Sequence, residues 1–395
     1  MFCRTALKAR CHFSIVPSAN RCASSSSSLP SSFEQAVGNT RLLRLRTASE
    51  STGCDIYGKC EWENPGGSIK DRAALWMLRS AEKSNILKPG SKGLIVEGTA
   101  GNTGIGLALA GKARGYDVLI CLADSQSPEK KDALRQAGAI LVEVPAVPFK
   151  NPNNYVHVAE RMALALLAED NVERNPYGKH IFYANQWDNL ANRQAHIDST
   201  GPEIWAQCGG KIDAFSCAVG TGGTLSGVAE FLRAVDSHIQ IALTDPEGAA
   251  VMRYFTEGKL KAYGSSITEG IGQGRITGNL GYGNFRPDMF FEIPDIDMLP
   301  IMHDLQSKEG LAVGGSAAVN VAGAIEVAKQ LGPGHTVVTM LCDRADRYAT
   351  KLYNKDFLNA AGLPVPEWMD NEDEKVEAFR DILQTALEKE EASDI

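Results

Sequence analysis

Short apolar segments recur along the chain and are separated by stretches with the periodicity of helices. The apolar segments are 94–96, 118–122, 140–142, 180–183, 214–219, 239–243 and 336–341. Most are continuous rather than alternating, which is typical of strands covered by helices on both faces. Between them apolar residues recur every three or four positions, as in 74–81 and 158–167. The alternation predicts an α/β protein in two domains, each a mainly parallel twisted sheet wound with helices.

Composition narrows the class of protein further. The 395 residues include 40 Lys and Arg against 48 Asp and Glu, a formal net charge of −8, which argues against a nucleic-acid-binding platform. No apolar run approaches the roughly 20 residues that span a bilayer, so we expect a soluble chain without a transmembrane span. The nine cysteines lack the spacing of a metal knuckle, and we expect no metal site.

The N-terminal segment, 1–33, differs from the rest of the chain. It is rich in Arg and Ser, and no acidic residue precedes Glu34. Basic residues interrupt the apolar run that a secretory signal needs, whereas this composition is typical of an organelle transit peptide. We expect 1–33 to be a disordered mitochondrial transit peptide. A plastid signal and a merely disordered terminus are the alternatives.

The remaining chain divides into three expected parts. Residues 34–187 form an N-terminal α/β domain that carries Lys70 and the loop of Asn102. Residues 188–369 form a C-terminal α/β domain with a glycine-rich loop and Ser316. Residues 370–395 are acidic, with apolar residues at helical spacing, and predict an amphipathic helix docked on the body with a frayed end.

A glycine-rich turn precedes a single lysine in the segment 64–72. The Pro-Gly-Gly sequence there places Lys70 at the start of a predicted helix. A partly desolvated lysine at the positive end of a helix has its neutral amine favoured, and that form attacks carbonyl groups. The alternative is an ordinary solvated surface lysine.

Three further glycine-rich segments follow predicted strands or begin predicted helices. The segment 98–104 offers backbone N–H groups, hydroxyls and an amide, which suit a carboxylate. The segment 220–224, Gly-Thr-Gly-Gly-Thr, predicts a cup for a phosphate, although it lacks the lysine of a Walker A loop and the acidic partner of a dinucleotide fold. Ser316 in the segment 314–318 begins a helix, where it could also be an N-cap.

These motifs carry a family resemblance. The segments 64–72, 99–104, 220–224 and 314–316 occur in the order seen in fold-type-II pyridoxal-phosphate enzymes, which share the tryptophan synthase β-like fold. More narrowly, the chain resembles the cysteine synthase and cystathionine β-synthase family, also in 200–205 and 270–274. Within it, the chain resembles most the second, divergent type of fungal cysteine synthase with a mitochondrial leader.

The resemblance implies pyridoxal 5'-phosphate as the cofactor and a role for each motif. Lys70 would form the internal aldimine and then transfer the α-proton. Asn102 would bind the ring hydroxyl, and Ser316 would face the pyridine nitrogen. The residues holding the phosphate would be Gly220, Thr221, Gly222, Gly223 and Thr224. The residues binding the substrate carboxylate would be Thr99, Ala100, Gly101, Thr103 and Gln186.

The implied reaction is a β-replacement that forms L-cysteine from O-acetyl-L-serine and sulfide through an α-aminoacrylate intermediate. The resemblance also implies a homodimer with small-molecule substrates. Ala100 stands where cysteine synthases usually have Ser, which removes one hydroxyl donor, and 66–68, 245–248 and 314–316 are closer to cystathionine β-synthase. A condensation of serine with homocysteine therefore stays an alternative, as does a pyridoxal-phosphate-binding homologue of low turnover.

Overall fold

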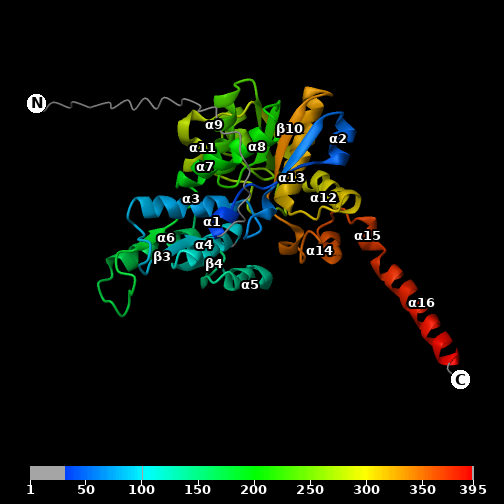
Figure 1. The fold of residues 1–395 in the computed structure, drawn as a ribbon, viewed down its shortest axis with the longest axis horizontal. Coiled ribbons are helices and arrows are strands. Elements are labelled where there is room, and N and C mark those ends of the chain that lie inside the picture. Colours follow the sequence, from blue (N-terminus) through cyan, green and yellow to red (C-terminus); the bar gives the residue numbers. More distant parts are fainter. Residues whose placement is uncertain (1–31, 100, 394–395) are drawn as a thin grey trace, which may run out of the picture.

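The larger of the two sheets of the computed structural model has six strands in the order β1-β2-β10-β7-β8-β9 (Figure 1). The structure describes residues 32–99 and 101–393. The strands are β1 (Leu42–Arg44), β2 (Asp55–Cys60), β7 (Ala214–Ala218), β8 (Gln240–Pro246), β9 (Met289–Ile293) and β10 (Thr336–Leu341). Only β1 runs antiparallel to its neighbour among these paired strands.

Helices cover both faces of this sheet. Ala214 and Ala218 of β7 belong to a core with helix α13 (Gly315–Leu331). Phe215 and Cys217 of the same strand belong to a second core with helix α9 (Gly223–Val235). Alternate side chains of β7 are thus buried in the cores on opposite faces of the sheet, as expected for a continuous apolar strand.

The smaller sheet has four parallel strands in the order β5-β4-β3-β6. They are β3 (Leu94–Gly98), β4 (Asp117–Ala123), β5 (Ile140–Val144) and β6 (Ile181–Tyr183). Helices α3 (Lys70–Lys83) and α4 (Asn102–Ala113) share a core with one face, and α6 (Tyr155–Ala168) packs on the other. The predicted fold class, two mainly parallel sheets wound with helices, is confirmed.

The remaining elements are shorter or peripheral. The other helices are α1 (Phe33–Ala36), α2 (Arg46–Thr52), α5 (Pro128–Gln136), α7 (Ala191–Ala195), α8 (Gly201–Gln207), α10 (Val251–Glu257), α11 (Gly278–Gly281), α12 (Asp295–Glu309), α14 (Lys355–Ala360), α15 (Glu367–Asp370) and α16 (Glu372–Ser393). Short turns of other helical types are η1 (Glu61–Glu63), η2 (His196–Thr200), η3 (Tyr282–Asn284) and η4 (Ala345–Arg347). Among the described residues, no helix has the length and apolar character needed to cross a bilayer.

Sheet membership differs from the predicted division of the chain at residue 187. Strands β1 and β2 come from the range 34–187 but join the six-stranded sheet. The reason is the full-length parallel pairing of β2 with β10, which puts Ile56 and Cys60 into the core of α13. The leader predicted for 1–33 lies outside the described residues up to position 31.

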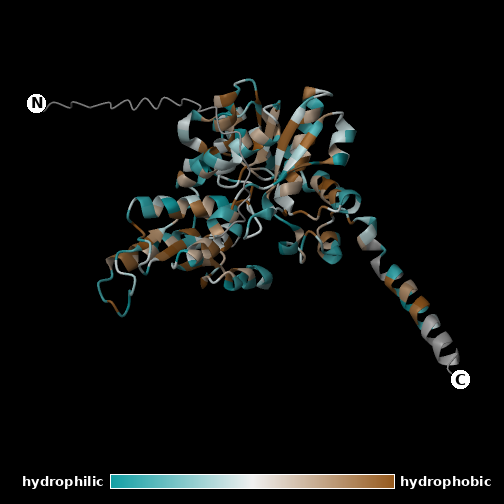
Figure 2. Cartoon of the chain, viewed as in Figure 1, coloured by the Kyte–Doolittle hydropathy of each residue, from teal (hydrophilic) through white to brown (hydrophobic). Residues whose placement is uncertain are grey.

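The C-terminal segment forms the predicted helix, α16, but the predicted docking on the body is wrong for its described side chains. Phe379 is 69% exposed and Ile382 is 65% exposed, and Val376 and Leu383 are exposed as well. The helix extends away from the body (Figure 1), and apolar and polar residues alternate along it (Figure 2). Its apolar stripe therefore faces solvent.

Candidate active site

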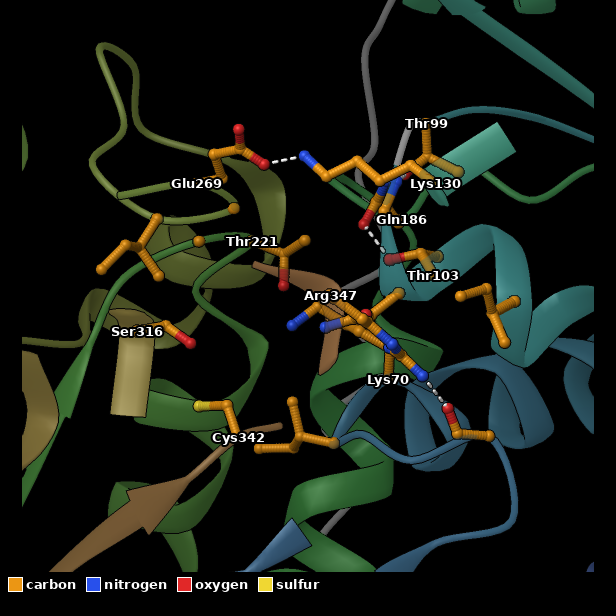
Figure 3. Close-up of a pocket in the computed structure, with 18 of the residues that line it drawn as sticks. Lys70, Thr99, Thr103, Lys130, Gln186, Thr221, Glu269, Ser316, Cys342 and Arg347 are labelled. Carbon is orange, nitrogen blue, oxygen red and sulfur yellow. Dashed lines mark hydrogen bonds and ion pairs between the residues drawn. The ribbon is translucent and has the colours of Figure 1, made fainter. Parts of the chain in front are cut away.

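A cavity of about 710 Å³ lies where the carboxyl ends of four strands meet. Loops that follow β3, β6, β7 and β10 all contribute to its wall, as expected at the carboxyl edge of parallel sheets. Most predicted site residues line it (Figure 3), namely Lys70, Thr99, Gly101, Asn102, Thr103, Gln186, Gly220, Thr221, Gly222, Thr224 and Ser316. Gly223 is buried at the start of α9, and Ala100 lies outside the described residues.

Lys70 is the first residue of α3 and is half-buried in the cavity wall. The turn before it is fixed by Asp71, which accepts a hydrogen bond from the Gly66 amide at 2.5 Å. Burial raises the pKa of Asp71 to about 7. The turn after it is fixed by Arg72, whose fully buried guanidinium pairs with Glu61 and Glu203. Lys70 is thus held from both sides along the chain.

The 220–224 loop connects β7 to α9 and has no room for side chains at its glycines. Gly222 has φ +82°, and a Cβ there would lie 2.6 Å from the Leu280 Cβ. A Cβ on Gly220 would overlap the Gly270 carbonyl oxygen, and one on Gly223 would overlap the Asn192 side chain. Backbone N–H groups at the start of a 13-residue helix are therefore open to close approach by an anion.

Two hydroxyls of this loop are held by side chains behind it. Asn192 Nδ2 donates to Thr221 Oγ1 at 2.9 Å, and Thr224 Oγ1 lies 3.2 Å from His196 Nε2. Burial lowers the pKa of His196 well below its usual value, so the imidazole is neutral. The loop therefore offers oriented neutral donors, which suit a phosphate.

On the other side of the cavity, α4 begins at Asn102. Thr103 Oγ1 donates to Gln186 Oε1 at 2.6 Å, and Gln186 comes from the loop after β6. Both side chains are buried but line the cavity (Figure 3). A helix start, an amide and a hydroxyl meet here, and together they fit a carboxylate.

Asn102 and Ser316 flank the remaining space. Asn102 Nδ2 donates to Asp343 Oδ2 at 2.7 Å, and the Arg347 guanidinium contacts the Asn102 side-chain oxygen. Ser316 lies in the first turn of α13, whose N-cap is Gly314, so Ser316 is not the cap. Its side chain is 7% exposed and lines the cavity.

Sequence reasoning missed several residues of the cavity. Cys342 and Arg347 follow β10 and line the cavity. The charged segment that directly follows this predicted strand could have indicated them, because ligands bind at the carboxyl ends of parallel strands. Lys130 of α5 pairs with Glu269 across the mouth (Figure 3), and Lys351 pairs with the same carboxylate at 2.5 Å. Burial lowers the pKa of Lys130 to about 8. Nothing in the sequence connects Lys130 with Glu269.

The donor set fits pyridoxal 5'-phosphate. It combines a lysine, a side-chain-free loop at a helix start, and polar side chains on both flanks of one cavity. Within the described ranges, no group of three His, Cys, Asp or Glu side chains is placed to hold a metal ion.

The chain belongs to the family of pyridoxal-phosphate-dependent enzymes, because the model of that family matches residues 33–343. Within this family, cysteine synthase 1 of Neurospora crassa is 49% identical over 84% of this chain and 86% of the relative. Cysteine synthase 2 of Schizosaccharomyces pombe is 41% identical over 85% of this chain and 86% of the relative. The cofactor is pyridoxal 5'-phosphate.

The comparisons refine the expected position within the family. Cysteine synthase 2 of N. crassa is 36% identical, so in that organism the first type is more similar to this chain than the expected second type. Among solved structures, the crystal structure of an O-ureido-L-serine synthase has a TM-score of 0.70 and 29% identity. The aligned region covers 84% of this chain and 100% of the O-ureido-L-serine synthase chain.

Proposed function

We propose that the chain is a cysteine synthase that forms L-cysteine from O-acetyl-L-serine and sulfide. The identity of 41–49% to cysteine synthases, over more than four fifths of the chain, supports this function. The observation that carries it is one cavity that is lined by Lys70, by the 220–224 loop and by the start of α4. When bound, pyridoxal 5'-phosphate withdraws electrons from the substrate so that the α-proton and the β-substituent can leave.

The residues that we assign to the cofactor lie on three sides of the cavity. Lys70 Nζ would hold the cofactor and would take the proton from Cα of the substrate. Asn102 would donate to the ring hydroxyl, and Ser316 would lie on the side of the ring nitrogen. The residues that would hold the phosphate are Gly220, Thr221, Gly222, Gly223 and Thr224. A serine hydroxyl cannot keep a proton on the ring nitrogen as a carboxylate does, and this favours loss of a β-substituent.

The substrate carboxylate is assigned to the start of α4 and the side chains beside it. The residues are Thr99, Ala100, Gly101, Thr103 and Gln186. Gln186 and the N–H groups of the helix start can donate to an anion, and the helix dipole favours its charge.

Purified holoenzyme given each substrate pair tests the function. We expect cysteine from O-acetylserine and sulfide, and no comparable rate of cystathionine formation from serine and homocysteine. The Lys70→Ala variant should lose about 10³-fold or more in turnover, and borohydride should no longer fix the cofactor to the chain. Cystathionine as the faster product, or undiminished fixation in the variant, contradicts the proposal.

We further infer a mitochondrial location and a homodimeric state. The location rests on the basic, Ser-rich composition of 1–33, and the dimer rests on the family resemblance. Import of the full chain into isolated mitochondria, compared with a chain lacking 1–33, tests the first. Sedimentation of the purified enzyme tests the second.

A further inference from the structure

A carboxyl group that the proposed chemistry does not use lies behind the wall of the cavity. Glu97, in the fully buried strand β3, has no exposed surface. Its Oε1 accepts from Gln186 Nε2 at 3.1 Å, and its Oε2 accepts from the Gln186 backbone amide at 3.4 Å. A buried carboxyl that accepts from both the side-chain amide and the backbone amide of Gln186 orients that residue.

Among the residues that the structure describes, no cation compensates the charge of Glu97. The titratable groups that face it are Cys121 on β4, Tyr155 at the start of α6 and Tyr183 at the end of β6. Among the ion pairs of the described residues, none includes Glu97. The charge of its carboxylate is therefore balanced by hydrogen bonds alone, and the donors of those bonds are held firmly in place.

Those donors come from a strained turn. Asn185 has φ +46°, a left-handed conformation that is uncommon outside glycine. Its backbone amide and that of Gln186 both contribute hydrogen bonds that favour the Glu97 carboxylate. Two consecutive N–H groups converging on one carboxylate fix the backbone from which the Gln186 side chain projects.

The same contacts decide which way the Gln186 amide points. A carboxylate can only accept, so the NH₂ group of Gln186 must face Glu97 and its oxygen must face Thr103. Thr103 uses its one hydroxyl hydrogen on Gln186 Oε1 at 2.6 Å. The second amide hydrogen of Gln186 then remains for an anion in the cavity. Thr103 contributes its backbone N–H at the helix start, and its hydroxyl orients the Gln186 amide.

We propose that Glu97 is a positioning residue for the α-carboxylate of the substrate, acting by fixing the Gln186 amide with one N–H toward the cavity. The inference rests on the function proposed above, since the carboxylate is that of the amino-acid substrate. Glu97 itself touches neither the substrate nor the cofactor, because the cavity wall does not include it.

The protonation of Glu97 gives the proposal a pH signature. Burial raises the pKa of its carboxyl to about 8. Below that pH the carboxyl carries a proton and donates to the Gln186 oxygen, which turns the NH₂ group toward Thr103 and away from the orientation that the ionised Glu97 fixes. Anion binding therefore strengthens as the pH rises through about 8. Burial lowers the pKa of Lys130 to about 8 as well, and its deprotonation over the same range changes binding in the opposite direction, because it removes positive charge.

The Glu97→Gln variant tests the proposal in the holoenzyme. Its new amide presents a donor where Gln186 needs an acceptor. At pH 9, where the carboxyl of unmodified Glu97 is mainly ionised, we therefore expect KM for O-acetylserine to be about tenfold higher in the variant. The expected kcat and KM for sulfide stay within about twofold, because the chemistry does not involve Glu97. The matched control is Asp245→Asn. Asp245 is equally buried, accepts the Met252 amide at 2.8 Å and lies outside the cavity wall. It should change the thermal midpoint but not KM.

Unmodified enzyme provides a second measurement that does not depend on how the variant folds. Propionate has a carboxylate that stays ionised between pH 7 and 9 and has no amine. Its inhibition constant against O-acetylserine should fall about fivefold to tenfold over that range, and this fall should vanish in Glu97→Gln.

The outcomes separate the two proposals. Suppose that the enzyme makes cysteine, but KM of the variant is unchanged and propionate binding does not depend on pH as stated. The positioning role is then wrong and the function stands. If Asp245→Asn raises KM as much as Glu97→Gln, the effect is one of general stability and the positioning role is likewise wrong. If the enzyme makes no cysteine, the function itself is wrong, and the propionate measurement alone still tests the coupling of Glu97 to anion binding.

Discussion

Arg72 stands two residues after Lys70 and has no exposed surface. Its guanidinium donates to Glu61 at 2.7 Å and to Glu203 at 2.7 Å, and Lys59 pairs with Glu203 at 2.7 Å. Removing one partner of such a buried group leaves an uncompensated charge, which is costly. At the scale of single residues, the position of Lys70 therefore depends on charges outside the cavity.

Replacing Glu203 by Gln should lower the free energy of unfolding by about 2–3 kcal/mol at pH 7. The neighbouring guanidinium and ammonium groups lower the pKa of Glu203 to about 2, despite burial. A lowered folded-state pKa stabilises the protein above the unfolded value of about 4.5, and this contribution is lost as the pH falls toward 2. Urea denaturation at pH 7 and at pH 3 measures both effects.

The control for this substitution is Glu377→Gln on α16. The Glu377 side chain is 68% exposed and pairs with Arg380 at 3.1 Å, so the expected loss is below about 0.5 kcal/mol. Equal losses in both variants, or an unchanged acid dependence in Glu203→Gln, contradict the assignment.

At the scale of elements, the 220–224 loop shows what a local sequence can determine. It was predicted as a phosphate-binding loop because glycines permit close backbone approach. In the structure Gly222 has φ +82° and lies against Leu280, and Gly220 lies against Gly270. Strand β10 was predicted with its observed limits because its apolar run is continuous. Strands β1, β2 and β9 were missed because they are short or are interrupted by polar residues, as by Lys59 in β2.

Residues that act through tertiary contacts could not be predicted. Glu97 and Gln186 lie far apart in sequence and meet only because β3 pairs with β6. Lys130 and Glu269 meet only because the two sheets face one another across the cavity. The order of motifs thus indicated the ligand-facing residues, whereas the groups that orient or enclose them needed the structure.

Replacing Gly222 by Ala should weaken cofactor retention and lower the thermal midpoint by several degrees. The new Cβ meets Leu280 at 2.6 Å in addition to the strain of φ +82°. The matched control is Gly258→Ala at the end of α10, with φ +71° and no atom within 4 Å. It carries only the backbone strain, about 1 kcal/mol, and should retain the cofactor fully. Cofactor content by absorbance and thermal unfolding report both quantities, and equal effects in the two variants contradict the overlap argument.

At the scale of the whole molecule, α16 contributes least to the body. Its apolar stripe at Val376, Phe379 and Leu383 is exposed along the described part of the helix. Met369, before it, is 6% exposed and belongs to the core. The body therefore ends, in terms of packing, near residue 370.

A chain that ends at residue 371 should keep the thermal midpoint within about 2 °C and the activity within about twofold, because few buried contacts are lost. The truncated enzyme should also be less prone to associate at high concentration, since four exposed apolar side chains are removed. Calorimetry and light scattering measure these properties. A drop of more than about 5 °C, or loss of the assembly state, shows that α16 packs on another surface.

The pairing of β2 with β10 has a consequence for the order in which the chain can fold during synthesis. Because Asp55 of β2 lies opposite Thr336 of β10, this inner strand of the larger sheet cannot pair with β10 until nearly the whole chain has left the ribosome. The smaller sheet and the helices that share its cores need no residue beyond about 184, so this part can close much earlier. Until then β2 presents an unpaired edge that invites aggregation, so nascent chains that stop before residue 336 should depend on chaperones far more than the finished protein does.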